Sequence, residues 1–526
     1  MASRNPFQNA PVEKRAAHAE SNPELLPQSE HDQKLLSRVH PRQWKNPEPA
    51  HCYNLVVIGA GTAGLVCAAG GAALGGRVAL VEHRMMGGDC LNWGCIPSKS
   101  IIRSSRFYAD VRDAELFAAP ASNTQEANFP AVMERMRRLR ARISKHDSVE
   151  RFQRLGLDVF LGMARFTGRN TVKVDGTTLR FKKAVIATGA RPRIPSIEGL
   201  TEAGFLTNET VFNLTLRPAH LMVIGGGPLG CELAQAFCRL GSEVTIVQEE
   251  PQFLPKEERD AAQMVADAFE RDGIHVRLNT KAVRVIPNDG RKEVRLISEG
   301  RENVVAVDQI LVGVGRAPNV EDLNLEAAGV RYDSENGVAA NDRLQTSNSN
   351  IYAAGDVCME HKFTHVAEAT ARIVVQNALF LGRKKASALT IPWCTYTDPE
   401  VAHVGLYVHE AVNRGIPVTT FTVPMNDVDR AIADGEEEGF VKIHVRDGSD
   451  KILGATIVAR HAGEMINEIS LAMVSGVGLK TIGKVIHSYP TQAEAIKKAA
   501  DAYMRTRLTP WLKTLSELWL AWTRRI

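Results

Sequence analysis

Two copies of one local pattern predict an α/β fold with two Rossmann-like dinucleotide-binding domains, followed by a C-terminal α+β dimerisation domain. In each copy, a short apolar strand runs directly into a glycine-rich turn, at residues 53–64 and again at residues 221–230. Continuous apolar runs of this kind are typical of strands buried on both faces of a parallel sheet. Residues 390–508 mix strand-like and helical stretches and contain no third glycine motif.

The length and composition are those of a multidomain globular protein. At about 150 residues per domain, 526 residues suggest three or four units. Hydrophobic residues make up 44% of the chain and charged residues 24%, as in soluble globular proteins. The net charge of +4 is small for this length, so no nucleic-acid partner is expected. An Arg-rich stretch at 129–155 has apolar residues at helical spacing and is interpreted as a solvated helix face.

The first 50 residues are polar and lack sustained periodicity, which predicts a mobile or surface-draped arm. They contain neither the apolar core nor the cleavage pattern of a signal peptide. No apolar run in the chain is long enough to span a bilayer. The eight cysteines mostly stand singly in apolar segments, which indicates a reducing compartment. The expected location is the cytoplasm.

The first glycine-rich turn contains Gly59, Gly61 and Gly64. The first glycine permits a tight turn, the second lets a pyrophosphate approach the backbone, and the third lets helix and strand pack closely. The N-terminus of the following helix offers free N–H groups to phosphates. Glu82 stands 18 residues after Gly64 and closes a second strand, where a carboxylate can bond a ribose diol. Together these features favour a dinucleotide site over a purely structural turn.

The second glycine-rich turn has the same context and contains Gly225, Gly227 and Gly230. Gln248 takes the place of the acidic residue, and Glu249 and Glu250 follow it. Two carboxylates would repel the 2′-phosphate of NADP. The sequence therefore favours NADH, with Lys256 as a cation that NADPH could recruit instead.

Cys90 and Cys95 lie close together in the segment GGDCLNWGCIPSK. Positions five apart in a regular helix have Cα atoms roughly 8–9 Å apart, whereas a disulfide needs about 4.4–6.8 Å. If the two bridge, the segment must bend, and Gly94 favours a bend. A helix starting here would place Cys95 near its positive end and lower the pKa of its thiol. A redox disulfide is favoured over two alternatives. One is a structural metal site, which would need more ligands than two cysteines, and the other is a pair of unrelated buried thiols.

This segment resembles the redox segment of the class I pyridine nucleotide–disulfide oxidoreductases, which include dihydrolipoamide dehydrogenase, glutathione reductase and mercuric reductase. The resemblance runs from about Tyr53 to about Leu508. Further matching pieces occur in the family's order, namely ATGA at 187–190, GVGRAPN at 313–319, AAGD at 353–356 and YTDPE at 396–400. The resemblance implies FAD at the first turn, NADH or NADPH at the second, and a homodimer.

These patterns together divide the chain into six segments. They are a polar arm (1–50), the first part of the FAD-binding domain (51–190), the NAD(P)-binding domain (191–314), the second part of the FAD-binding domain (315–388), the dimerisation domain (389–508) and an amphipathic Trp-rich tail (509–526).

The resemblance also implies roles for individual residues. Cys95 would lie against the flavin as a thiolate, and Cys90 would be the interchange thiol that meets the acceptor. Lys99 and Glu232 match an ion pair near flavin N5, and Asp356 matches the carboxylate that holds the ribityl chain. The implied FAD contacts are Gly59, Gly61, Gly64, Glu82, Gly88, Lys99, Ala164, Thr188, Gly189, Asp356 and Thr364. The implied NAD(P) contacts are Gly225, Gly227, Gly230, Glu232, Gln248, Glu249 and Gly315.

One departure from the family pattern concerns the proton donor. Dihydrolipoamide dehydrogenase and glutathione reductase carry a histidine before the proline that precedes a glutamate, and this chain has Tyr489 there while retaining Glu494. Phenol titrates near pH 10 and imidazole near 6.5, so Tyr489 is a poor proton shuttle. His487 is the nearby alternative. Mercuric reductase also lacks that histidine, so the resemblance favours its branch, although neither an N-terminal Cys-x-x-Cys domain nor a C-terminal cysteine pair is present.

The implied reaction passes electrons from NAD(P)H through FAD and the Cys90–Cys95 disulfide to a metal ion or small electrophile. Tyr489 and Glu494 of the second subunit would complete the site. A reductase of a small disulfide such as lipoamide or glutathione is the alternative. A third hypothesis, from another class, is a non-catalytic redox sensor or membrane-docked subunit that keeps its flavin only structurally.

The tail holds three of the six tryptophans. On a helix, five of its apolar residues would form one stripe, and basic residues close the end of the chain: Trp511, Leu515, Leu518, Trp519 and Trp522. Packing back onto the protein or the dimer is the favoured interpretation, ahead of peripheral membrane contact and docking to a partner.

Overall fold

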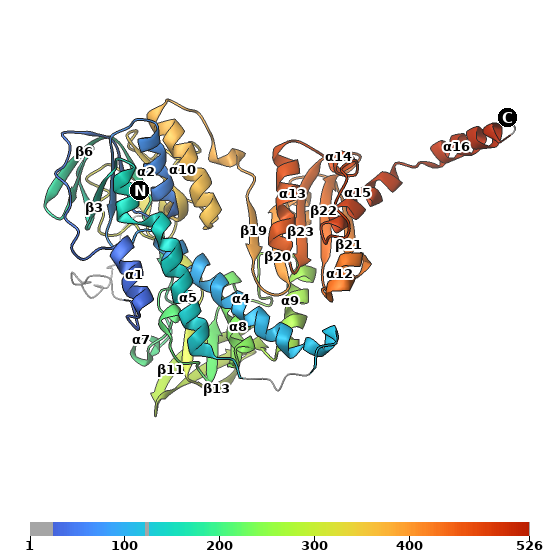
Figure 1. The fold of residues 1–526 in the computed structure, drawn as a ribbon, viewed down its shortest axis with the longest axis horizontal. Helices are drawn as coiled ribbons and strands as arrows, with labels where there is room; N and C mark the ends of the chain where they lie inside the picture. The colour runs from blue at the N-terminus through green and yellow to red at the C-terminus, as the bar shows by residue number, and fades with distance from the viewer. Residues whose placement is uncertain (1–24, 121–125, 525–526) are drawn as a thin grey trace, which may run out of the picture.

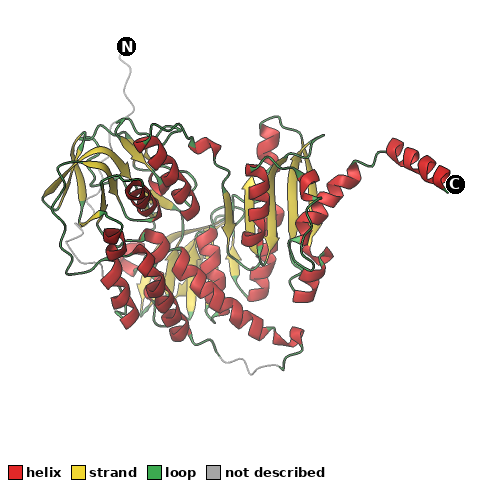
Figure 2. Cartoon of the chain, turned by 45° about the horizontal axis from the view of Figure 1, so that its top comes forward, coloured by secondary structure: helices red, strands yellow, loops and turns green. Residues whose placement is uncertain are grey.

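The computed structural model describes residues 25–120 and 126–524 (Figure 1). It contains three main sheets, each with helices packed beside it (Figure 2). This architecture confirms the predicted fold class. The first two sheets are built around the two glycine-rich turns, and the third belongs to the C-terminal domain.

The first sheet surrounds the first glycine-rich turn. Its strand order is β3 (Asp158–Leu161), β2 (Val78–Glu82), β1 (Tyr53–Ile58), β6 (Thr177–Ile186), β5 (Thr171–Val174) and β4 (Ala164–Gly168), and β18 (Ile351–Ala353) also pairs with β6. Strands β1, β2, β3 and β18 run parallel to their neighbours, whereas β4 and β5 form an antiparallel extension. Because β18 comes from far along the chain, a late segment returns to complete the first unit.

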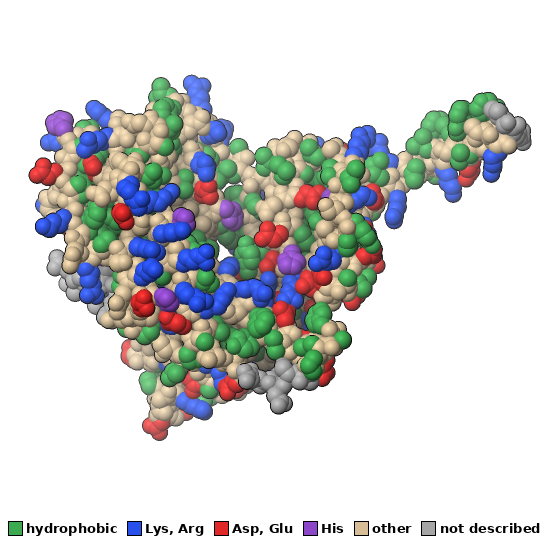
Figure 3. All heavy atoms as spheres, viewed as in Figure 1, with side chains coloured by type: hydrophobic (Ala, Val, Ile, Leu, Met, Phe, Trp, Pro, Cys, Tyr) green, Lys and Arg blue, Asp and Glu red, His purple; other side chains and the backbone are tan. Residues whose placement is uncertain are grey.

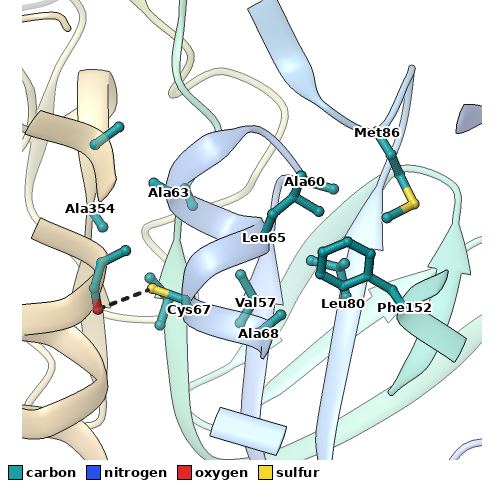
Figure 4. Packing of buried hydrophobic residues seen from close by; sticks show 14 of the residues in the cluster. Val57, Ala60, Ala63, Leu65, Cys67, Ala68, Leu80, Met86, Phe152 and Ala354 are labelled. Carbon is teal, nitrogen blue, oxygen red and sulfur yellow. Dashed lines mark hydrogen bonds between the residues drawn. The ribbon is translucent and has the colours of Figure 1, made fainter. Parts of the chain in front are cut away.

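Two helices from distant parts of the sequence pack together over this sheet. They are α2 (Thr62–Ala73), which follows the glycine turn, and α10 (Thr364–Leu379). The thiol of Cys67 on α2 donates to the carbonyl oxygen of Ala371 on α10, with a sulfur–oxygen distance of 3.6 Å (Figure 4). Val57, Leu65, Ala68 and Leu80 are buried in the same core (Figure 4).

The second sheet has four parallel strands in the order β10 (His275–Arg277), β9 (Glu243–Val247), β8 (His220–Ile224) and β14 (Gln309–Val312). Its helices are α8 (Pro228–Arg239) and α9 (Arg259–Asp272), and an antiparallel sheet of β11 (Thr280–Asn288), β12 (Arg291–Ser298) and β13 (Arg301–Val307) adjoins it. The chain leaves the first unit at β7 (Ala190–Pro192) and returns at β15 (Arg316–Pro318). These two strands pair with each other, so the two crossings lie side by side.

The C-terminal sheet is antiparallel. Its order is β19 (Pro392–Thr395), β20 (Glu400–Gly405), β23 (Ile452–Ala459), β22 (Phe440–Arg446) and β21 (Val418–Pro424). Helix α13 (Ala462–Val474) packs on β20 and β23, and α15 (Glu494–Thr506) packs on β21 and β22. The remaining helices and strands are α1 (Glu30–Val39), α3 (Gly88–Asn92), α4 (Cys95–Arg112), α5 (Phe129–Ile143), α6 (Val149–Arg154), α7 (Leu200–Ala203), α11 (Val408–Asn413), α12 (Asp429–Asp434), α14 (Leu479–Ile482), α16 (Pro510–Thr523), β16 (Tyr332–Asp333) and β17 (Gly337–Val338).

The described part of the N-terminal segment differs from the predicted surface arm. Helix α1 buries Leu35 and Val39 completely. Asp32 on α1 accepts from Arg140 on α5 at 2.8 Å, and both side chains are buried. Local signals for this helix were present, since Leu35 and Val39 lie one turn apart and Ser29 and Asp32 form a capping box. The burial itself could not be predicted, because the partner Arg140 on α5 is distant in the chain. Residues 1–24 lie outside the described residues.

Candidate active site

The two neighbouring cysteines lie on either side of a break between two helices. Cys90 is in α3, Cys95 is the first residue of α4, and Trp93 and Gly94 separate the helices. A Cβ atom on Gly94 would lie 2.8 Å from the carbonyl oxygen of Asp89, so the break requires glycine. The bend that the spacing demands is therefore present. Both cysteines are free thiols in this structure.

The environment of the pair separates the two thiols chemically. A hydrogen bond from Cys90 lowers the pKa of Cys95 to about 6, with help from the charge of Lys99 and from Thr364, while burial opposes this shift. The Thr364 hydroxyl lies 3.4 Å from the Cys95 sulfur. The same thiol–thiol hydrogen bond, together with burial, raises the pKa of Cys90. Near neutral pH, Cys95 is the thiolate and Cys90 is the thiol that donates to it.

An ion pair joins this helix to the second unit. Lys99 on α4 donates to Glu232 on α8 at 2.7 Å, as the family resemblance implies. Burial alone would lower the pKa of Lys99, but the charges of Glu232 and Cys95 raise it overall. Glu232 also accepts from the backbone N–H of Tyr396 at 2.9 Å, and the Lys99 ammonium lies 4.6 Å from the Tyr396 ring centroid. The cation beside Cys95 is thus held by three parts of the chain.

The first glycine-rich turn has space for a phosphate at its middle glycine. A Cβ atom on Gly59 would lie 2.4 Å from the carbonyl oxygen of Ala187, and one on Gly64 would lie 1.7 Å from that of Gly59. A Cβ atom on Gly61 would meet nothing closer than 3.7 Å. The outer glycines therefore serve backbone packing, and the middle one leaves an open approach. This arrangement fits the pyrophosphate of FAD.

The second glycine-rich turn repeats this geometry with one chemical change. The carboxylate of Glu82 accepts from the backbone N–H of Ala60 at 2.7 Å. In the second unit, the amide oxygen of Gln248 accepts from the backbone N–H of Gly226 at the same distance. Gln248 therefore occupies the position equivalent to Glu82, but without the charge. Glu249 beside it is exposed, and its carboxylate lies 3.7 Å from the ammonium of Lys281.

The other predicted FAD contacts lie on the segments around the first turn. A Cβ atom on Gly88 would lie 2.6 Å from the Cα of Gly61, so the cysteine helix begins directly beside the turn. The Thr188 hydroxyl donates to the carbonyl oxygen of Asn319 at 2.7 Å. The backbone N–H of Asn319 in turn donates to the carbonyl oxygen of Gly189. Ala164 is buried at the start of β4. The carbonyl oxygen of Gly315 accepts from the backbone N–H of Arg193, where the chain passes between the first and second units.

Comparison with known proteins identifies the family. Residues 53–371 match the family described as pyridine nucleotide-disulphide oxidoreductase, and residues 391–500 match the dimerisation domain of that family. The chain belongs to the pyridine nucleotide-disulphide oxidoreductases. This oxidoreductase is 33% identical over 448 residues to a mercuric reductase of Staphylococcus aureus, which covers 85% of this chain and 82% of that protein.

The chain is also similar to relatives with other names. The chain is 35% identical over 464 residues to a dihydrolipoyl dehydrogenase of Thermus scotoductus, covering 86% of this chain and 97% of that protein. Its fold matches that of the HOCl-induced flavoprotein disulfide reductase RclA from Escherichia coli, with a TM-score of 0.76 and 28% identity over 85% of this chain and 99% of that one. The protein is therefore an FAD-dependent NAD(P)H oxidoreductase with a redox-active disulfide. Its dimerisation domain supports a homodimer.

The predicted residues of the C-terminal domain do not reach the cysteine pair of their own chain. Within the described residues, no hydrogen bond or ion pair joins Tyr489, His487 or Glu494 to Cys90 or Cys95. The exposed Tyr489 donates to Asp429 at 2.9 Å, which raises its pKa. The ring of His487 lies 2.9 Å from Glu468. The Glu494 carboxylate lies 3.8 Å from Lys498, and one of its oxygens is buried without a hydrogen-bond partner among the described residues.

Arg316 is a site residue that the sequence reasoning missed. It pairs with Asp89 and donates to the carbonyl oxygen of Ala190 at 2.6 Å. Its Nε lies 3.5 Å from Asp356, and burial raises the pKa of that carboxyl. Arg316 thus neutralises two carboxylates between the flavin segment and the cysteine helix. Its place inside the GVGRAPN motif was the available signal.

Asp147 is a second residue without a sequence signal. It ends the short 3₁₀ helix Ser144–Asp147. A Cβ atom on Gly87 would lie 3.1 Å from its carboxylate, so Asp147 lies against the turn that begins α3. Its charge raises the pKa of Cys90, and burial raises the pKa of Asp147 itself. Only the tertiary fold brings this carboxylate close to Cys90.

Proposed function

We propose that this oxidoreductase passes electrons from NADH through FAD and the Cys90–Cys95 pair to a metal ion or small electrophile. The combination of two features carries the proposal. The paired thiols have opposite pKa shifts, while the family's proton-donor position is occupied by Tyr489. The site is thus equipped to present sulfur ligands and poorly equipped to supply a proton.

The residues around the cysteine pair would have distinct roles in this reaction. Bound FAD would supply the two-electron chemistry that links the nicotinamide to the disulfide. Lys99, held by Glu232, keeps positive charge beside Cys95. Cys90 carries the proton of the pair and must release it when its sulfur bonds to an acceptor. The partly buried Arg316 neutralises Asp89 and Asp356 nearby, so their charges do not oppose thiolate formation.

The proposed class of acceptor follows from the number of protons that each reduction requires. Reduction of a small disulfide must deliver protons to two leaving thiolates, which a group titrating near neutrality does well. The phenol of Tyr489 is a weak acid whose pKa Asp429 raises further. A soft metal ion bound by two thiolates needs no proton donor for its reduction. A mercuric reductase among the relatives and a Cu(II) complex of RclA, at 28% identity, support a metal-ion acceptor.

The second subunit completes the proposed site. In this arrangement, Tyr489 and Glu494 of one copy face Cys90 of the other, across the dimerisation domain. The buried, unpartnered oxygen of Glu494 supports this role, because a buried polar atom without a partner normally marks a missing interaction.

The nucleotide preference rests on the second turn. Gln248 uses its amide oxygen on the backbone of the turn, and the exposed carboxylate of Glu249 lies beside it. NADH is therefore the proposed donor. Glu249→Lys should improve kcat/KM for NADPH relative to NADH by roughly tenfold. If the wild-type protein already prefers NADPH, this part of the proposal is wrong.

A direct test compares acceptors under steady-state turnover. The FAD-loaded protein with NADH should reduce Hg(II) or Cu(II) faster than oxidised lipoamide or glutathione disulfide. Cys90→Ser should abolish this activity. Cys238→Ser should not, because Cys238 lies near the C-terminal end of α8, where its thiol donates to the carbonyl oxygen of Asp272. Fast turnover of lipoamide would favour the second candidate function, a small-disulfide reductase, which the dihydrolipoyl dehydrogenase relative also supports.

A further inference from the structure

The C-terminal helix α16 buries no side chain against the part of the chain that the structure describes. Its N-terminus is capped by the Thr509 side chain, which accepts from the backbone N–H of Leu512. Of the described residues in this helix, none is buried. Figure 1 shows α16 projecting away from the C-terminal domain beyond α15. The expected packing of the tail onto its own chain is therefore absent.

The helix is amphipathic over its whole length. At 3.6 residues per turn, six large apolar side chains fall within an arc of roughly 120°. Their exposed fractions range from 42% to 69% for Trp511, Leu512, Leu515, Leu518, Trp519 and Trp522. Lys513, Glu517 and Arg524 fall on the opposite side, which also carries one exposed leucine, Leu520. Figure 3 shows hydrophobic side chains along one edge of this helix and basic ones along the other.

Charge is concentrated at this end of the molecule. Residues 502–526 contain five basic residues and one acidic residue, which equals the net charge of +4 of the whole chain. The remaining residues therefore sum to no net charge. Among the described residues, no carboxylate pairs with the four basic side chains resolved here, Arg505, Arg507, Lys513 and Arg524. About half of the described arginines before residue 502 form ion pairs, and many of the others are single exposed side chains. The basic residues of the tail instead stand together without a carboxylate, so this cluster is available to an external anion.

We propose that α16 docks on an anionic phospholipid surface, with its tryptophan face at the boundary between headgroups and acyl chains. Helices with a Trp- and Leu-rich face and a basic polar face bind membrane interfaces in this way. The basic side chains of α16 would stay within about one Debye length of the headgroups, since a helix is about 10 Å across.

The observations disfavour the two other ways of covering the apolar face. No helix in the described residues is long and apolar enough to cross a bilayer, so α16 would lie in the interface instead. A tail-to-tail contact between two copies would bring two basic clusters together, which is unfavourable in an isologous interface. A homodimer would present two tails to one surface, and their binding would reinforce each other.

The test uses the full-length, FAD-loaded protein in vesicle flotation. It should float with phosphatidylcholine vesicles that contain phosphatidylglycerol and remain in solution with phosphatidylcholine alone. Binding should fall at least tenfold in a chain ending at residue 509 and should weaken in high salt. Steady-state reductase activity should be the same for both chains, because α16 touches no residue of the candidate active site.

A matched pair of variants separates the tail from general surface hydrophobicity. Replacing Trp511, Trp519 and Trp522 by alanine should abolish flotation. Replacing three leucines of the body whose side chains are on average more exposed than these tryptophans, Leu216, Leu381 and Leu471, should leave flotation unchanged. Tryptophan fluorescence of the unmodified protein should shift to shorter wavelength on adding the anionic vesicles.

Two results would overturn the proposal. One is equal flotation of the full-length and shortened chains. The other is a pair of findings: the unmodified protein binds no lipid, and the variant without the three tryptophans loses its dimer in sedimentation velocity. That pair would show that a second copy covers the helix. Neither result depends on the electron acceptor, so failure here leaves the proposed function untouched.

Discussion

Cys95 and Cys231 lie in the first turns of two helices, α4 and α8, but their thiols behave in opposite ways. The pKa of Cys95 is lowered to about 6, whereas burial raises the pKa of Cys231. Cys95 receives a hydrogen bond from Cys90 and faces Lys99, while Cys231 is fully buried and lies next to the acidic Glu232. A helix N-terminus therefore does not by itself make a reactive thiol; the neighbouring donor and cation decide.

The largest test of this comparison is to remove the reactive sulfur. Cys95→Ser should lower NADH-dependent acceptor reduction by roughly 1,000-fold or more, because the disulfide can no longer form. FAD should remain bound, since the glycine-rich turn is unchanged. Cys67→Ser, at a buried thiol on α2, is the control and should retain most activity. Activity persisting in Cys95→Ser would assign the redox centre elsewhere.

The pH dependence should differ between the thiols. Because the pKa of Cys95 is lowered to about 6, its thiolate dominates above that pH and is lost as pH falls through it. At pH 5 roughly 10% should remain ionised. Ultraviolet thiolate absorbance of the reduced protein, compared with Cys95→Ser, measures this titration. A midpoint near 9 would mean that the fold does not activate Cys95.

Removing the cation should shift the same titration. Lys99→Met should raise the pKa of Cys95, because the negative charge of its thiolate then loses the neighbouring cation. Alkylation of Cys95 at pH 7 should slow by about tenfold. Lys99→Arg retains the charge and serves as the control. Mass spectrometry of alkylated peptides follows each cysteine separately. If Lys99→Met and Lys99→Arg behave alike, the charge is not the cause.

The smallest expected effect concerns Cys90. Asp147→Asn removes a negative charge that raises the pKa of Cys90, so Cys90 should ionise at lower pH. Alkylation of Cys90 in the Cys95→Ser background should then become a few-fold faster at pH 8. Glu150→Gln, an exposed neighbour on α6, should change nothing. An unchanged rate in Asp147→Asn would show that water screens this carboxylate.

The sequence by itself determined the features that depend on local backbone geometry. Both glycine-rich turns were predictable because a side chain at Gly59 or Gly64 would collide with nearby backbone. The break beside Gly94 was predictable because five helical residues hold two cysteines too far apart to bridge. The position of Gln248 followed from spacing alone and coincides with that of Glu82.

Only the tertiary structure decided the contacts between residues that are distant in the chain. The buried pair of Asp32 and Arg140 converts part of a polar segment into a packed helix. Asp147 reaches the turn that begins the cysteine helix, and no described segment of the chain buries the side chains of α16. Backbone sterics act within a few residues and can be read locally, whereas burial and charge depend on which distant segments the fold brings together.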